Sequence, residues 1–180
     1  MAAQLQPGNT RKGNPWRLAV WGTAAGLLLL PAIAMQLGAE GVHWTAFDFV
    51  VMGTLLGSCC AAYELATRMS GNTLYRLGFA VAIALGFLLV WINLAVGIIG
   101  DEDNLANAVF AGVLLVGAIG ALLGQLRAAG MARAMVATGI AQLLAGGYAL
   151  VLGSMEGGML SAAFAVMWFT SAALFHKAAR

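Results

Sequence analysis

The sequence predicts an all-α, polytopic membrane protein: a six-transmembrane-helix bundle with both termini in the cytoplasm. Three observations lead to this fold class. First, the 180 residues are 62% hydrophobic and only 9% charged, whereas soluble domains contain about 25% charged residues. Second, the apolar runs are continuous and long enough for helices, and they lack the alternation of a β-barrel. Third, the basic and acidic residues fall in alternating loops along the chain, as in a multi-pass protein.

The apolar runs place one transmembrane domain, residues 18–176, between two cytoplasmic tails. Residues 1–17 are expected to form a flexible N-terminal tail, and residues 177–180 form a short second tail. A run of about 20 apolar residues is enough to cross the hydrocarbon core. The expected spans are about 18–36, 48–67, 77–100, 105–126, 134–153 and 159–175.

The first span follows Trp16 and Arg17, residue types that favour the membrane interface, and Pro31 is a candidate for a kink near its outer end. A secretory signal peptide is the alternative, because a basic flank and an apolar core precede Ala32-Ile-Ala34, a pattern typical of a cleavage site. The apolar run is longer than the core of about 7–15 residues in a signal peptide. We therefore expect this helix to be retained.

Short polar turns separate the remaining spans. Ser70-Gly-Asn72 is a turn signal between the second and third spans, and the third span is long enough to cross with tilt. An acidic turn leads into the fourth span, and a loop that contains Gly130 leads into the fifth. The loops are expected at 38–46, 68–76, 101–104, 127–133 and 154–158.

The distribution of charge predicts the orientation in the membrane. With six spans, the tails and the second and fourth loops lie on one side, and these segments hold all nine Lys and Arg residues. The opposite side holds six of the seven acidic residues: Glu40, Asp48, Asp101, Glu102, Asp103 and Glu156. Because basic loops stay in the cytoplasm, both termini are expected there. One span more or fewer would scatter the basic residues over both faces.

The turn between the third and fourth spans concentrates oxygen ligands. Five residues there carry carboxylate or amide oxygens: Asp101, Glu102, Asp103, Asn104 and Asn107. Ca²⁺ and Mg²⁺ prefer such oxygens, and the three acids are the predicted metal ligands, although the spacing lacks the glycine and closing glutamate of an EF-hand loop. The alternative is a structural turn, in which Asp103 or Asn104 caps the fourth helix and the acids favour its positive end.

Asn93 lies about 10 Å along the third helix from this turn. In lipid its amide must find partners, so it is expected to face other helices. A helix-to-helix hydrogen bond is one reading, and the polar floor of an outward-facing pocket closed by the acidic turn is the other. Trp91 lies at a similar depth, where it serves either the interface or a pocket wall. Asp48 lies on the same side of the membrane as the acidic turn. The residues considered for a solute or ion pathway are Asn93, Trp91, Asp48, Glu64, Asn104 and Asn107.

Glu64 is the one acidic residue within the inner half of a span. A carboxylate at the bilayer centre costs about 2.5–3.5 kcal/mol on insertion scales. Arg68 lies four residues later on the same helical face, in the favourable order, and both residues lie near the cytoplasmic interface. An ion pair at the interface is therefore expected, and a carboxylate that couples to protons or cations from the inside is the alternative.

The sequence shows no catalytic motif, so we expect no enzyme activity and no cofactor. Cys59 and Cys60 are neighbours in an apolar run, where a disulfide between them is not expected. His43 and His176 fall on opposite sides of the predicted membrane, so they do not share a haem or a metal. The spans contain no lysine for a retinal Schiff base, and Walker, HExxH and GxSxG sequences are missing.

Glycine pairs at a spacing of four residues recur on four segments of the chain. The pairs are Gly22/Gly26, Gly53/Gly57, Gly120/Gly124 and Gly153/Gly157. Such pairs let helix backbones approach closely. Packing within the bundle is the expected use, and a contact with another subunit is the alternative.

A stretch of the chain is similar to a known group of proteins. The run Trp91-Ile-Asn-Leu-Ala-Val-Gly-Ile-Ile-Gly100, followed by Glu102-Asp-Asn104 and Ala106-Asn107, resembles a family of small uncharacterised bacterial inner-membrane proteins. Gly130-Met-Ala-Arg-Ala134 is similar to the same family, so the likeness covers residues 90–135. The resemblance implies a location in a bacterial inner membrane, and it brings no activity and no catalytic residues.

Two functions follow from these features. The first is a structural or accessory subunit of the bacterial inner (cytoplasmic) membrane, whose partners are the lipid bilayer and either further copies or a larger complex that binds its glycine-rich helix faces. The alternative is a small transporter or channel for a cation or cationic solute. A membrane enzyme with a cation in the outer turn is the third and least favoured hypothesis, and nucleic acid is not an expected partner. A cavity that reaches Asn93 would favour transport, and a sealed bundle would favour the subunit.

Overall fold

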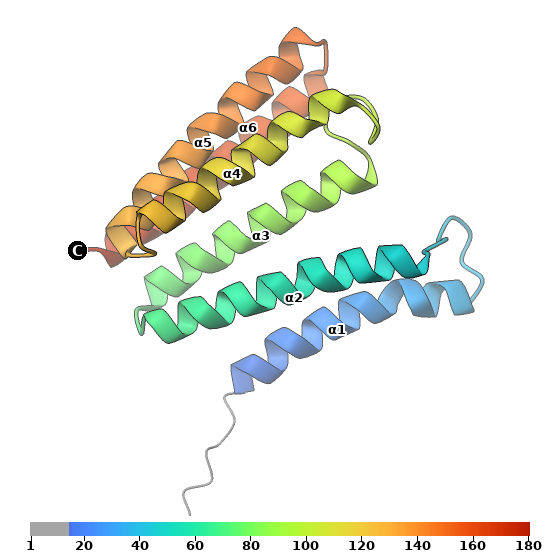
Figure 1. The fold of residues 1–180 in the computed structure, drawn as a ribbon, viewed down its shortest axis with the longest axis horizontal. Coiled ribbons are helices and arrows are strands. Elements are labelled where there is room, and N and C mark those ends of the chain that lie inside the picture. The colour runs from blue at the N-terminus through green and yellow to red at the C-terminus, as the bar shows by residue number, and fades with distance from the viewer. Residues whose placement is uncertain (1–14) are drawn as a thin grey trace, which may run out of the picture. The chain divides into compact units, whose positions relative to one another are not determined.

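The computed structural model describes residues 15–180, and all of its regular secondary structure there is helical (Figure 1). Six helices in this range are long and apolar enough to cross a membrane. The all-α fold predicted from the sequence is therefore confirmed, as is the presence of six helices that could each cross a membrane. The predicted tail of residues 1–17 lies outside the described residues, except for its last three, which begin the first helix.

Each predicted span coincides with a helix, although several ends differ. The elements are α1 (Pro15–Gln36), α2 (Ala46–Met69), α3 (Thr73–Ala95), the 3-10 helix η1 (Leu105–Asn107), α4 (Ala108–Leu123), α5 (Ala128–Val151) and α6 (Met155–Ala178). Pro31 lies inside α1. The prediction of a loop over residues 127–133 is wrong, because α5 begins at Ala128. Gly130 faces the backbone of Gly124 in that first turn, so this glycine serves close packing and not a turn.

The predicted third span also ends too late. α3 stops at Ala95, and the amides of Val96 and Gly97 both donate to the carbonyl of Ile92, at 3.0 Å each. Gly97 has a φ of 72°, a left-handed conformation that glycine adopts without strain. The prediction extended the helix through Ile98 and Ile99 because they are apolar, but both residues are buried in a loop and do not continue the helix.

The chain divides into two compact units, residues 1–60 and residues 61–180. In the described part of the first unit, α1 and the first part of α2 form a helical hairpin. The thiol of Cys60 lies 3.9 Å from the carbonyl oxygen of Val20. The Asp48 carboxylate accepts hydrogen bonds from the amide and hydroxyl of Thr45, at 2.7 and 2.8 Å, and so closes the first turn of α2. Asp48 therefore has a structural role within this hairpin.

The second unit is built around α5 and α6, which pack antiparallel along their whole lengths (Figure 1). α4 packs on α5, and α3 packs on α6. Small residues permit the closest approaches: Gly146 meets Ser161 between α5 and α6, and Gly120 meets Ala134 between α4 and α5. The Ser171 hydroxyl donates a buried 2.8 Å hydrogen bond to the carbonyl of Gly78 on α3.

Charge is sorted along the length of the second unit. Because its helices run antiparallel, the starts of α3 and α5 and the end of α6 lie together, and they carry basic residues. The opposite end carries acidic residues, at the α3–α4 connection and at the start of α6. The basic end holds Arg68, Arg76, Arg127, Arg133, Lys177 and Arg180, and the acidic end holds Asp101, Glu102, Asp103 and Glu156. The alternation of charge read from the sequence thus becomes two ends of one bundle.

Candidate functional site at the acidic end of the bundle

The acidic end is organised by a buried side chain that fixes the loop between α3 and α4. The Asn107 Oδ1 atom accepts hydrogen bonds from the amides of Ile98 and Ile99, at 3.0 and 2.8 Å. Its Nδ2 atom donates to the carbonyl of Asp101 at 2.7 Å, and to that of Ile99 at 3.4 Å. Asn107 is only 8% exposed. Both amide atoms are thus occupied by the backbone, so its role here is to hold the loop.

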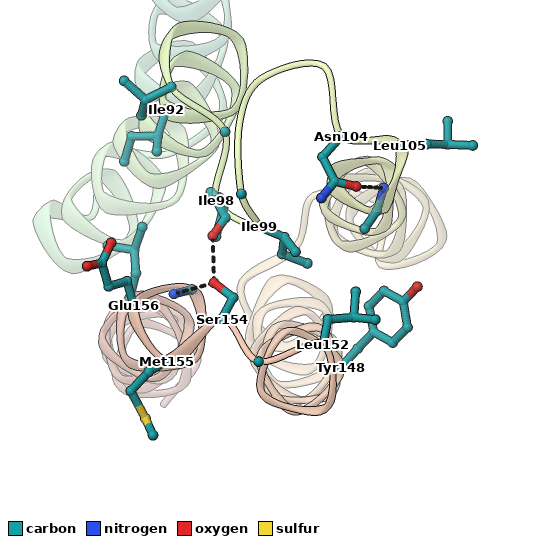
Figure 2. A pocket seen from close by; sticks show the side chains of 17 residues that line it. Ile92, Ile98, Ile99, Asn104, Leu105, Tyr148, Leu152, Ser154, Met155 and Glu156 are labelled. Carbon is teal, nitrogen blue, oxygen red and sulfur yellow. Dashed lines mark hydrogen bonds between the residues drawn. The ribbon is translucent and has the colours of Figure 1, made fainter.

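Two further side chains hold the loop at its edges. Asn104 accepts a 3.0 Å hydrogen bond from the amide of Ala106 and caps η1, the 3-10 helix before α4. The prediction that Asp103 or Asn104 caps the fourth helix itself is wrong, because the N-cap position of α4 is Asn107. Ser154 precedes α6, where its Oγ accepts a hydrogen bond from the amide of Gly157 at 3.2 Å and donates to the carbonyl of Ile98 at 3.3 Å (Figure 2). The loop is therefore attached to both α4 and α6.

A large cavity of about 1280 Å³ lies between this loop and the ends of α5 and α6. Figure 2 shows Ser154 near its centre, with Tyr148 and Leu152 on the α5 side and Ile98 above. Glu156 is its acidic lining residue, and its lining contains no Lys, Arg or His. The cavity reaches one turn into α6, at Leu160. Sequence analysis assigned no role to Ser154 or Tyr148, although the position of Ser154 before a helix is a typical capping signal.

A second cavity, of about 450 Å³, lies on the other side of the loop, between α3 and α4. It is lined by Asn93, Glu102, Asp103 and Asn107, together with apolar residues of both helices. Asn104 and the residue after it line both cavities, so the loop forms the wall between them. The structure therefore brings together the predicted polar floor and the acidic turn.

The side chain of Asn93 behaves differently from the expectation. Its Nδ2 atom donates to the carbonyl of Leu89 at 2.8 Å, a bond within its own helix rather than between helices. Its Oδ1 atom is buried, without a hydrogen-bond partner among the described residues. Trp91 packs against Phe87 on the same helix, with ring centroids 5.8 Å apart, and lines neither cavity. Trp91 is thus separate from the site.

The three acids of the turn are exposed. Within residues 15–180, no group of three His, Cys, Asp or Glu side chains is placed so that it could hold a metal ion. The metal site predicted at Asp101, Glu102 and Asp103 therefore has no support from the geometry and stays a prediction. Their carboxylates also form no ion pair within the described chain. The loop therefore places negatively charged side chains beside two cavities.

Glu64 lies at the opposite, basic end of the second unit. Its carboxylate forms an ion pair with Arg68, four residues later in α2. The ion pair expected from the spacing of the two residues is confirmed. The pairing gives Glu64 a structural partner. Glu64 lines neither of the two cavities at the acidic end.

The glycine pairs have different environments. Gly120 and Gly124 pack against α5, as expected for a pair used within the bundle. Gly153 has a φ of 84° and lies in the turn before α6, so Gly153 and Gly157 do not form a helical pair. In the α1–α2 hairpin, nothing lies within 4 Å of the positions that side chains on Gly22 and Gly26 would occupy.

The fold and the site together define an all-α protein with six helices that could cross a membrane and with a polar, acidic end. Comparisons of the chain with protein-family models, with curated proteins and with solved structures found no match. The resemblance of residues 90–135 to a family of bacterial inner-membrane proteins therefore stays a prediction. The function has to be argued from the site itself.

Proposed function

We propose that the protein spans the bacterial inner membrane six times, with both termini in the cytoplasm, and that it binds and transports a cation or cationic solute. The orientation is supported by the charge of the second unit, whose basic end would face the cytoplasm. Its acidic end, with both cavities, would then face outwards.

The observation that carries the transport proposal is the pair of cavities at the acidic end. Their charged lining residues are Glu102, Asp103 and Glu156, and basic side chains are missing from both linings. A cavity lined with one sign of charge raises the local concentration of ions of the opposite sign. Carboxylate, amide and carbonyl oxygens also suit a hard cation or an ammonium group. A cation is therefore the ligand class that this end of the protein favours.

Reconstitution into vesicles tests the proposal. The purified protein is placed in liposomes with a negative internal potential, and the uptake of K⁺, Na⁺ and methylammonium is compared with that of protein-free liposomes. We expect uptake of at least one probe, reduced several-fold in the double variant Glu102→Gln, Asp103→Asn. Because these acids are exposed, uptake by the wild-type protein should also fall as the salt concentration rises.

The matched control is Glu40→Gln, which removes an acidic side chain from the turn of the α1–α2 hairpin and should leave uptake unchanged. Protein-free rates for all three probes with the wild-type protein would contradict the proposal. Equal uptake by the wild-type protein and the double variant would show that the acidic end is not the site.

A complex-forming subunit is the second candidate function, and a different observation favours it. In the α1–α2 hairpin, nothing lies within 4 Å of the positions that Cβ atoms on Gly22 and Gly26 would occupy. A glycine pair of this spacing is a typical contact for another transmembrane helix. The partner would be a second copy or another membrane protein.

This candidate is tested by isolating the protein from native membranes in mild detergent. We expect the wild-type protein to migrate as a larger assembly, and the variant Gly22→Leu, Gly26→Leu to migrate as a single chain. Gly147→Leu in α5 is the control, because that glycine also has nothing within 4 Å. A single-chain mass for the wild-type protein would rule out the subunit function.

A further inference from the structure

The interior of the second unit contains three polar side chains without a partner. Gln142 of α5 and Ser161 and Trp168 of α6 are 0%, 1% and 3% exposed. Four of their atoms are buried and have no hydrogen-bond partner in the described chain: both amide atoms of Gln142, the hydroxyl of Ser161 and the indole Nε1 of Trp168. Nearly all buried polar groups in native proteins have a partner. A bundle core with four such atoms therefore needs an explanation.

The packing register places these side chains along one seam. Gly146 of α5 lies against Ser161 of α6, and Gly139 lies against Phe169. Because the helices are antiparallel, Gln142 is level with a position between Ser161 and Trp168. Each of the two then lies about 4–6 Å from it along the helix axis, at 1.5 Å per residue. A small molecule beside Gln142 would be within reach of both.

The chemistry of the three groups specifies the ligand. Trp168 can only donate, Ser161 can donate and accept, and Gln142 does both through separate atoms. None of these groups carries a charge. The ligand must therefore be neutral, small, and able to donate and accept hydrogen bonds, as water is.

Along α6, the seam begins one residue after the lining of the large outer cavity. That cavity ends at Tyr148 on α5 and Leu160 on α6, and Ser161 is the next residue of α6. Toward the basic end, the next buried hydroxyl groups are already satisfied, since Thr138 donates to the carbonyl of Ala134 and Ser171 to that of Gly78.

Three aromatic rings pack between α3 and α6 toward the basic end. Tyr75, Phe79 and Phe175 form a buried cluster with ring centroids 5.3–6.1 Å apart. The hydroxyl of Tyr75 donates a 2.6 Å hydrogen bond to the carbonyl of Leu126 and so holds this cluster in place.

We infer that Gln142, Ser161 and Trp168 form a buried water-binding site in the core of the second unit, between α5 and α6. The inference goes beyond the proposed transport of cations. It depends on the interior of α5 and α6 and not on the acidic side chains, so either can fail without the other.

NMR of the full-length protein in lipid nanodiscs tests the site directly. The tryptophan indoles are labelled with ¹⁵N, and the Trp168 signal is assigned from its loss in Trp168→Phe. We expect an indole proton with a hydrogen-bonded chemical shift, a cross-relaxation signal to water, and exchange with solvent deuterium within minutes to hours. In the double variant Gln142→Leu, Ser161→Ala, the same exchange should be about tenfold slower.

Thr138→Val is the matched control, because Thr138 is equally buried one turn from Gln142 but already has a partner. It should leave the exchange of the Trp168 indole unchanged. A Trp168 indole without a signal to water in the wild-type protein, protected for days, would overturn the inference. The inference would also be overturned if the indole proton had the chemical shift of a hydrogen-bonded group but gave no signal to water, because Gln142 would then accept the proton directly. The wild-type measurement decides even if the double variant does not fold.

Discussion

Replacing Asn107 with alanine should release the loop that forms the acidic end. The change removes three good hydrogen bonds to the loop backbone, those to the amides of Ile98 and Ile99 and to the carbonyl of Asp101. At about 1 kcal/mol net for each bond, the loop should lose about 3 kcal/mol of local stability. Since about 1.4 kcal/mol corresponds to a factor of ten, exchange of the Ile98 and Ile99 amides should accelerate about 100-fold.

Hydrogen–deuterium exchange in detergent micelles measures this effect residue by residue. Asn104→Ala is the control, because it removes one exposed hydrogen bond that caps η1 and should leave the amides of Ile98 and Ile99 protected. Asn107→Asp keeps the acceptor oxygen and loses the donor, so it should give an intermediate rate. Unchanged protection of both isoleucine amides in Asn107→Ala would refute the role of this side chain.

Two further predictions concern packing and charge. Gly130→Ala should destabilise the protein by about 1–3 kcal/mol, because the new methyl group would collide with the backbone of Gly124; Gly112→Ala, where nothing lies within 4 Å, should not lower the thermal midpoint. Glu64→Gln should change the free energy of unfolding by only about 0.5 kcal/mol, because it removes one pair with the exposed Arg68 side chain. A large loss of yield or stability in Glu64→Gln would contradict this reading.

The sequence predicts the helices well because hydropathy alone determines which segments can cross a bilayer. It does not predict where α3 ends. Ile98 and Ile99 are as apolar as a helix interior, and only the partner Asn107, eight and nine residues away, shows that they belong to a buried loop. Gly130 led to the opposite error. Its sequence context predicts a turn, whereas in the structure it permits close packing between helices.

The candidate site was only partly accessible from the sequence. Negative charge in one turn and the polar residue Asn93 below it are visible as a pattern, and the structure places them around one cavity. The larger cavity depends on how α5 and α6 meet the loop, which no local pattern shows. Gln142 and Trp168 were overlooked for a related reason. A single polar residue in an apolar helix gives no indication of whether it faces lipid, a neighbouring helix or a buried partner.

The most direct test of the whole account is the accessibility of the two ends of the second unit in intact cells. Single cysteines are introduced by Ser70→Cys and Asp103→Cys in a background without Cys59 and Cys60, and they are treated with a membrane-impermeant maleimide. We predict that the cysteine at position 103 is labelled in cells with a permeable outer membrane, and that the one at position 70 is labelled only after the inner membrane is opened. Labelling of both positions from the same side would contradict the six-span arrangement and, with it, the outward-facing site.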